Sequence, residues 1–204
     1  MPTWLTYALV IGGILLVSGG LMAWVMARVK IRELHENLAK ATKLKLEYAS
    51  PKAFQFSGNY GGYPAQITPE TAAERNAGVP IYSKVMLPMV NPNDKYFSVN
   101  KASSPAPWQE IIAYPGEKPV VPVTHELGDN ILLQSNDLWF SSILLNEAVK
   151  QRLQIVMGLQ PAICVAIKGE ELFALIPRKM KGKEDQKRYA ETLQLLADMK
   201  DALQ

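Results

Sequence analysis

The chain has 204 residues, with 22 Lys and Arg against 19 Asp and Glu, so its formal net charge is +3. That charge is too small to indicate nucleic-acid binding, and we expect no nucleic-acid partner. The single cysteine, Cys164, excludes an internal disulfide, and its apolar neighbours predict a small buried side chain.

The first segment is strongly apolar, because no charged residue occurs from Leu5 to Ala27. A helix of that length, rising about 1.5 Å per residue, covers the roughly 30 Å hydrocarbon core of a bilayer. No basic residue precedes the apolar run, as it would in a cleaved signal peptide. We therefore predict a retained transmembrane anchor over residues 1–27.

The cations Arg28, Lys30 and Arg32 follow this segment directly, while residues 1–4 carry no charged side chain. Basic residues resist translocation, so the sequence predicts a single-pass membrane protein with its N-terminus outside and its C-terminal domain in the cytoplasm, most simply in a bacterial inner membrane. The three cations are predicted to lie at the membrane surface.

Small residues recur along the apolar segment. Gly12, Gly19, Ala23 and Ala27 predict a face on which another membrane helix packs closely. The alternative is that glycine is simply frequent in transmembrane helices.

A juxtamembrane helix is expected over residues 28–50, because Ile31, Leu34 and Leu38 recur every three or four residues. The dipeptide Ser50-Pro51 ends it, since proline disfavours helical geometry in the residue before it. His35 lies on this helix, where we expect a solvated or interfacial side chain.

The remaining residues, 51–204, are predicted to form one extramembrane domain. Residues 53–57 and 65–68 alternate like strands of a hairpin around a glycine-rich turn. Further strands are expected over 79–90 and 96–99.

Residues 101–122 are rich in proline and predict a long surface excursion, because proline lacks the donor that a sheet interior needs. Trp108 in this stretch is the candidate for contact with a partner. The alternative is that its ring attaches the excursion to the domain.

The last third of the chain alternates strands and helices. A strand over 131–135 precedes a helix capped by Ser141 or Asn146 and stopped at Gly158. A hairpin over 162–176, a basic link over 178–183 and an amphipathic final helix follow. Short connections of this kind favour an α+β fold with a mainly antiparallel sheet and two or three helices, following the transmembrane helix.

The densest group of titratable residues is His125, Glu126 and Asp129. It lacks the second histidine of a paired zinc motif, and the glycines near residue 60 do not match a phosphate-binding loop. We therefore predict no catalytic residue, no cofactor site, no metal site and no enzymatic activity.

These features favour a non-enzymatic accessory or scaffold subunit of a larger membrane protein complex. Its expected partners are integral membrane subunits and the lipid bilayer, with anionic lipids as further candidates. The alternative is a membrane-tethered module that binds a ligand or lipid as a sensor. A third possibility is an enzyme that uses the His125 cluster.

Overall fold

The computed structural model describes residues 3–50, 53–69, 82–91, 93–104, 106–124, 126–159, 163–177, 180 and 182–204. Within these ranges it does not describe the side chains of residues 3–10, 12, 14, 49, 50, 53, 106, 107, 110 and 177.

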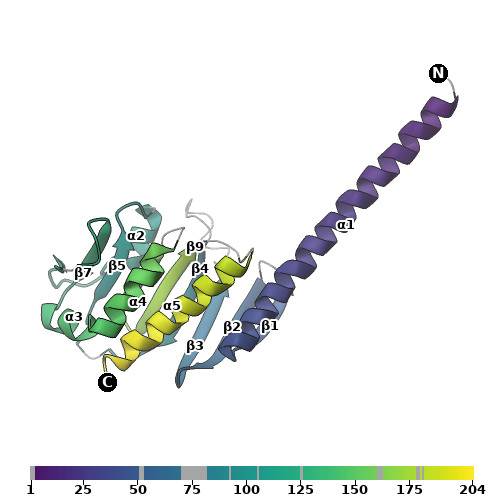
Figure 1. Ribbon diagram of the computed structural model, residues 1–204. Coiled ribbons are helices and arrows are strands. Elements are labelled where there is room, and N and C mark those ends of the chain that lie inside the picture. The colour runs from purple at the N-terminus through teal and green to yellow at the C-terminus, as the bar shows by residue number, and fades with distance from the viewer. Residues whose placement is uncertain are drawn as a thin grey trace.

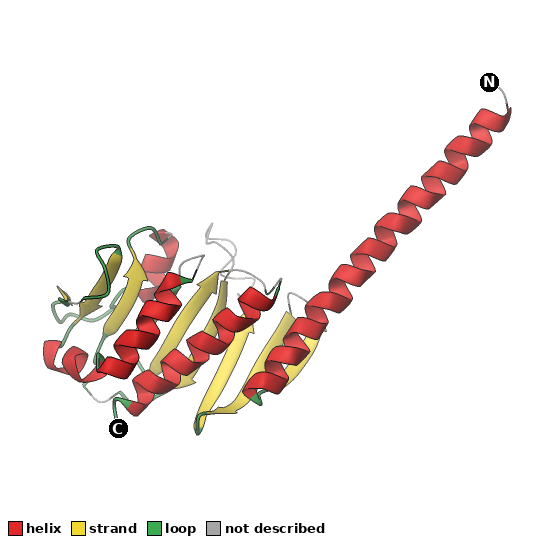
Figure 2. Ribbon diagram, viewed as in Figure 1, coloured by secondary structure: helices red, strands yellow, loops and turns green. Residues whose placement is uncertain are grey.

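A long N-terminal helix precedes strands and shorter helices (Figures 1 and 2). The elements are α1 (Thr3–Thr42), β1 (Lys45–Ser50), β2 (Ala53–Tyr60), β3 (Tyr63–Pro69), β4 (Tyr82–Pro88), β5 (Phe97–Lys101), α2 (Ala106–Ile112), β6 (Val121–Pro122), β7 (Ile131–Ser135), α3 (Leu138–Leu144), α4 (Glu147–Gly158), β8 (Cys164–Lys168), β9 (Glu171–Pro177) and α5 (Lys183–Asp201).

The nine described strands form one sheet in the order β1-β2-β3-β4-β9-β8-β5-β7-β6. Every pair of neighbours is antiparallel. The predicted α+β class with an antiparallel sheet is therefore confirmed.

The two faces of the sheet bury different sets of side chains, because successive residues of a strand point to opposite sides. In β8, Val165 and Ile167 point into the larger core, whereas Cys164 and Ala166 point into the smaller one. Figure 2 shows α4, α5 and the end of α1 lying across one face of the sheet, where the larger core forms. The smaller core lies under α2.

Helix α1 has 40 residues, which corresponds to a length of about 60 Å. Its C-terminal part packs on the domain through Leu34 and Leu38, which are buried. The rest of the helix projects away from the domain (Figure 1).

Among the described residues, no helix is long and apolar enough to cross a membrane. The predicted transmembrane span runs from Leu5 to Ala27. The side chains of residues 5–10, 12 and 14 of this span are not among those that the structure describes.

The predicted helix over residues 28–50 is too long. Helix α1 ends at Thr42, and Lys43 adopts a left-handed backbone conformation with φ of 59°. Residues 45–50 instead form strand β1, which pairs with β2. The apolar side chains Leu44 and Leu46 fit either a helix or a strand, so the pattern of the sequence alone did not locate the boundary.

The later elements agree with prediction in part: four helices, α2 to α5, follow α1 among the described residues, where two or three were expected, and α2 and β6 lie in the stretch predicted to be a surface excursion. Both predicted hairpins are present, as β2–β3 and β8–β9. The single helix expected before Gly158 is two helices, because Asp137 caps α3 and Asn146 caps α4. Asn146 is thus a confirmed cap, whereas Ser141 is buried inside α3.

Candidate interaction surfaces

The projecting part of α1, which we call the arm (described side chains at 11, 13 and 15–29), is exposed throughout. Leu16, for example, is 79% exposed. The arm carries most of the large exposed apolar side chains among the described residues: Ile11, Leu15, Leu16, Val17, Leu21, Met22, Trp24, Val25, Met26 and Val29.

These apolar side chains surround the helix. Leu15, Leu16 and Val17 are consecutive, and consecutive residues of an α-helix point in directions about 100° apart. A helix that is apolar on all sides belongs in the interior of a larger assembly or in a membrane. Burial of apolar surface contributes about 25 cal/mol per Å², so an arm left in water forgoes a large stabilisation.

The predicted helix-packing residues lie on the arm, apart from Gly12, which is outside the described side chains. A Cβ added at Gly19 would meet nothing within 4 Å, and Ala23 and Ala27 are exposed. No described part of the chain covers this face, so it is open to another helix.

A basic collar follows the arm and consists of Arg28, Lys30 and Arg32, all of them exposed. The Arg28 guanidinium lies 3.8 Å from the centre of the Trp24 ring. This cation–π contact holds a charge at the end of the apolar surface, where an interface between apolar and aqueous surroundings would place it.

His35 lies where the arm meets the domain, and its predicted exposure is wrong: its side chain is fully buried. Its ring is 4.4 Å from that of Phe54, measured between centroids, and also contacts Tyr48 and Phe56. Since a carbonyl only accepts, Nδ1 donates to the Ile31 oxygen at 2.7 Å. Nε2 is buried without a hydrogen-bond partner among the described residues.

A groove, which we call the edge groove, runs between α1 and β1. Its volume is about 380 Å³. Its lining residues are Arg32, Glu36, Ala39, Lys40, Leu46 and Tyr48.

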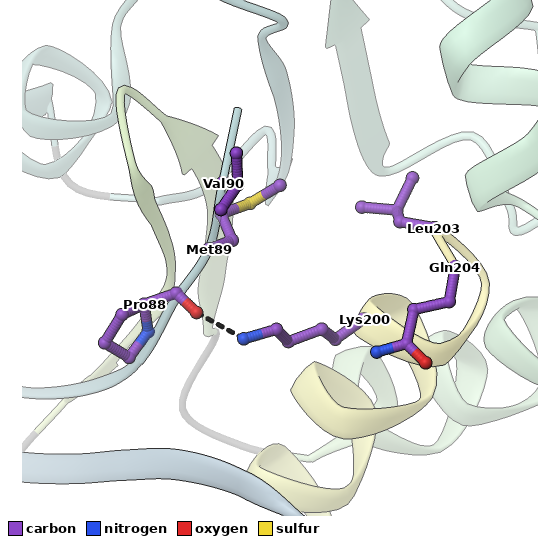
Figure 3. Close-up of a pocket in the computed structure, with 6 residues that line it drawn as sticks. All are labelled: Pro88, Met89, Val90, Lys200, Leu203 and Gln204. Carbon is purple, nitrogen blue, oxygen red and sulfur yellow. Dashed lines mark hydrogen bonds between the residues drawn. The ribbon is translucent and has the colours of Figure 1, made fainter. Parts of the chain in front are cut away.

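A second hollow, the end pocket, lies between the segment after β4 and the end of α5 and has a volume of about 450 Å³. Figure 3 shows Met89 and Val90 on one side, Leu203 and Gln204 on the other, and Lys200 reaching across between them. The Lys200 ammonium donates a hydrogen bond to the Pro88 carbonyl, and partial burial lowers its pKa.

The prediction that Trp108 contacts a partner requires an exposed ring, and the structure contradicts it. Trp108 is 1% exposed and packs edge-on against Tyr82 in the smaller core. The proline-rich stretch contains helix α2, which Trp108 holds against the sheet. The alternative of attachment to the domain is the one observed.

An exposed tryptophan occurs elsewhere and was missed. Trp139 on α3 is 71% exposed, and its neighbour Leu138 is also exposed. The signal was present in the sequence, because Leu138, Trp139 and Phe140 are consecutive and one short helix cannot bury all three. Phe140 takes the buried position.

The described residues do not bring the predicted cluster of His125, Glu126 and Asp129 together into a site. His125 lies outside the described residues, and Glu126 and Asp129 are exposed. A search of the described side chains finds no group of His, Cys, Asp and Glu able to hold a metal ion. Cys164 is buried as predicted, and burial raises the pKa of its thiol to about 11.

Comparison with known proteins finds a likeness in structure but no match in sequence. No protein-family model matches the sequence, and neither does any curated protein. The crystal structure of the mycobacterial trehalose monomycolate transport factor A, TtfA, is similar, with a TM-score of 0.54 over 85% of this chain and 94% of that chain. The two sequences are 11% identical, so this likeness shows the fold alone.

Proposed function

We propose that this protein is a non-enzymatic accessory subunit of a larger membrane protein complex, which it joins through the arm. The observation that supports the proposal is the exposed apolar surface around the whole of the arm. The open face at Gly19, Ala23 and Ala27 suits a neighbouring membrane helix, since small residues let helix backbones approach closely.

In this proposal the arm is part of a single-pass membrane anchor. It rests on the uncharged run from Leu5 to Ala27 and on the basic collar. The collar would remain on the cytoplasmic side with the domain, and Met1 would lie outside. An accessory role is also consistent with the similar structure, which is that of a transport factor.

The decisive experiment is gentle detergent extraction from native membranes, followed by native-gel separation and mass spectrometry. The proposal expects the chain to migrate in a defined assembly with integral membrane subunits. A variant with Leu15→Lys and Leu21→Lys should leave that assembly, because charged side chains are costly in apolar surroundings. A strictly monomeric wild-type protein would overturn the proposal.

The control places the same two charges on the domain, at the exposed positions Ala148 and Gln151 of α4. The Ala148→Lys, Gln151→Lys variant should remain in the assembly. If it also dissociates, added charge rather than the arm accounts for the loss.

The orientation has a separate test that uses the buried thiol. Cys164 is inaccessible in the folded chain, so an introduced cysteine gives the only labelling expected from a membrane-impermeant maleimide. Thr3→Cys should react in intact cells, whereas Gln204→Cys should react only after permeabilisation. The reverse pattern would refute the proposed orientation.

A second candidate function is a membrane-tethered module that binds a ligand or lipid, and the end pocket favours it. Its apolar walls and its one cation, Lys200, suit an amphipathic anion. Oleate is a suitable probe, and Lys200→Met should weaken its binding, whereas Lys187→Met at an exposed site on the same helix should not. Equal binding by both variants would exclude this pocket.

A further inference from the structure

The sheet has two edges, and they differ in length. At one end is β6, which has two residues, one of them Pro122. At the other end is β1, which has six residues and pairs with β2 on one side only. No strand in the described ranges pairs with its other side. An unpaired edge offers backbone donors and acceptors to an added strand.

The edge groove lies alongside this strand and has a mixed lining. Ala39 of α1 and Leu46 and Tyr48 of β1 are its apolar contributors. Arg32 and Lys40 add two exposed cations. An extended segment paired with β1 would place alternate side chains into this groove, because side chains of a strand alternate between its two faces.

The charge of the chain segment that contributes the groove is unbalanced. From Arg28 to Tyr48 the chain has six cations and three acids, and this excess equals the net charge of +3 of the whole chain. The rest of the protein is therefore electrically neutral. The six cations are all exposed: Arg28, Lys30, Arg32, Lys40, Lys43 and Lys45. Arg32 and Lys40 line the groove itself, whereas Lys45 points to the opposite face of β1 from Leu46 and pairs with Glu47 at 3.2 Å. The excess of cations beside the groove favours an acidic partner.

The distribution of the cations distinguishes a peptide from a flat membrane surface. Along α1, Lys40 lies about 18 Å beyond Arg28, at about 1.5 Å per residue. Electrostatic screening at physiological salt has a length of about 8 Å, so a bilayer that meets the helix at Arg28 exerts little force on Lys40. A six-residue extended segment is about 20 Å long, which is enough to reach from Arg28 to Lys40.

We propose that the edge groove receives an acidic, extended segment of a partner protein, which adds to the sheet beside β1. Its carboxylates bind Arg32 and Lys40, and its apolar side chains contact Leu46 and Tyr48. In the free protein Arg32 is paired with Glu36 at 2.9 Å on the surface. The partner's carboxylate replaces Glu36, at little cost, because exposed ion pairs contribute only about 0–1 kcal/mol.

The test uses the full chain in a non-ionic detergent with fluorescently labelled peptides. The first peptide has Glu and Val by turns at every second position, with Thr between them (Glu-Thr-Val-Thr-Glu-Thr-Val), so that Glu and Val reach the groove from the same face of the strand. The matched peptide has Lys in place of Glu. We expect the acidic peptide alone to bind, with an affinity that falls as salt is added. Hydrogen exchange should slow at backbone amides of residues 45–50 when it binds, a readout that charge attraction without strand pairing would not give.

The matched variants locate the site. Arg32→Glu with Lys40→Glu should weaken binding at least about tenfold, which corresponds to about 1.4 kcal/mol. Lys187→Glu, an exposed site on α5, should leave binding unchanged. Equal weakening by both variants, binding of both peptides, or unchanged exchange in β1 would each overturn the proposal.

Two further measurements separate this inference from its alternatives. If vesicles of phosphatidylglycerol bind through Arg32 and Lys40 while the acidic peptide does not, the groove recognises a membrane and the proposal is wrong. The Leu15→Lys, Leu21→Lys arm variant should still bind the peptide. Peptide binding in the edge groove and attachment through the arm can therefore be refuted independently of each other.

Discussion

The ring of His35 joins the arm to the domain at a point that solvent does not reach. Burial lowers the pKa of His35 below its usual value, and the hydrogen bond to the Ile31 carbonyl offsets this only in part. The unfolded chain therefore binds more protons than the folded chain between the lowered pKa and about 6.5. Stability is fully present above that upper value and falls as the pH drops below it.

We expect His35→Leu to reduce the loss of folding stability at low pH. At pH 7 the variant should resemble the wild type or exceed it slightly, because an unpartnered buried polar atom is removed. At pH 5 it should be more stable than the wild type by up to about 2 kcal/mol, because each pH unit below about 6.5 costs a buried neutral imidazole up to about 1.4 kcal/mol. Urea unfolding at both pH values measures the effect, and both proteins retain His125. If the stability of the wild type and that of the variant change with pH in parallel, burial of a neutral His35 between the arm and the domain is wrong.

The thiol of Cys164 should be unreactive in the folded protein. Its thiol is fully buried and its pKa is raised to about 11, so thiolate is scarce at pH 8. A chromogenic disulfide reagent should leave the native protein unmodified and react with one thiol per chain in denaturant. Rapid reaction of the native protein would show that the smaller core opens readily.

Helix α2 packs on the sheet through a single large aromatic side chain, Trp108. Trp108 fills the space between this short helix and the sheet. We expect Trp108→Ala to lower the free energy of unfolding by about 3–5 kcal/mol, as for other buried aromatic side chains. The matched variant is Trp139→Ala, whose ring is exposed, and it should change stability by about 0.5 kcal/mol or less. Denaturant unfolding of the two variants provides the measurement, and similar losses would contradict the packing of α2.

The elements also show what the sequence could predict. Strands such as β8 and β9 were recognisable because short apolar runs flank a turn. Helix α2 was not, because Pro105 and Pro107 suggested a loop, although proline is compatible with the first turn of a helix. The edge groove could not be predicted at all, since it requires α1 to stop at Thr42 and the chain to return as β1.

At the scale of the whole molecule, the protein consists of a packed domain and a projecting arm that shares few contacts with it. Leu34 and Leu38 belong to the core, whereas residues 15–30 are exposed. The same helix therefore stabilises the domain at one end and offers an attachment surface at the other. This division explains why the apolar run and the cations after it were recognisable along the sequence, while the burial of His35 depends on contacts with the folded domain.

Removal of residues 1–29 should consequently leave the domain as stable as before, because the deleted side chains with a described position are exposed. In contrast, Leu38→Ala in the full chain should cost about 2–5 kcal/mol, since Leu38 is fully buried. Urea unfolding followed by tryptophan fluorescence compares the two, with the intact chain in the same detergent as reference. A large loss of stability on deletion would mean that the arm helps to fold the domain, and the independence of attachment from folding would then be lost.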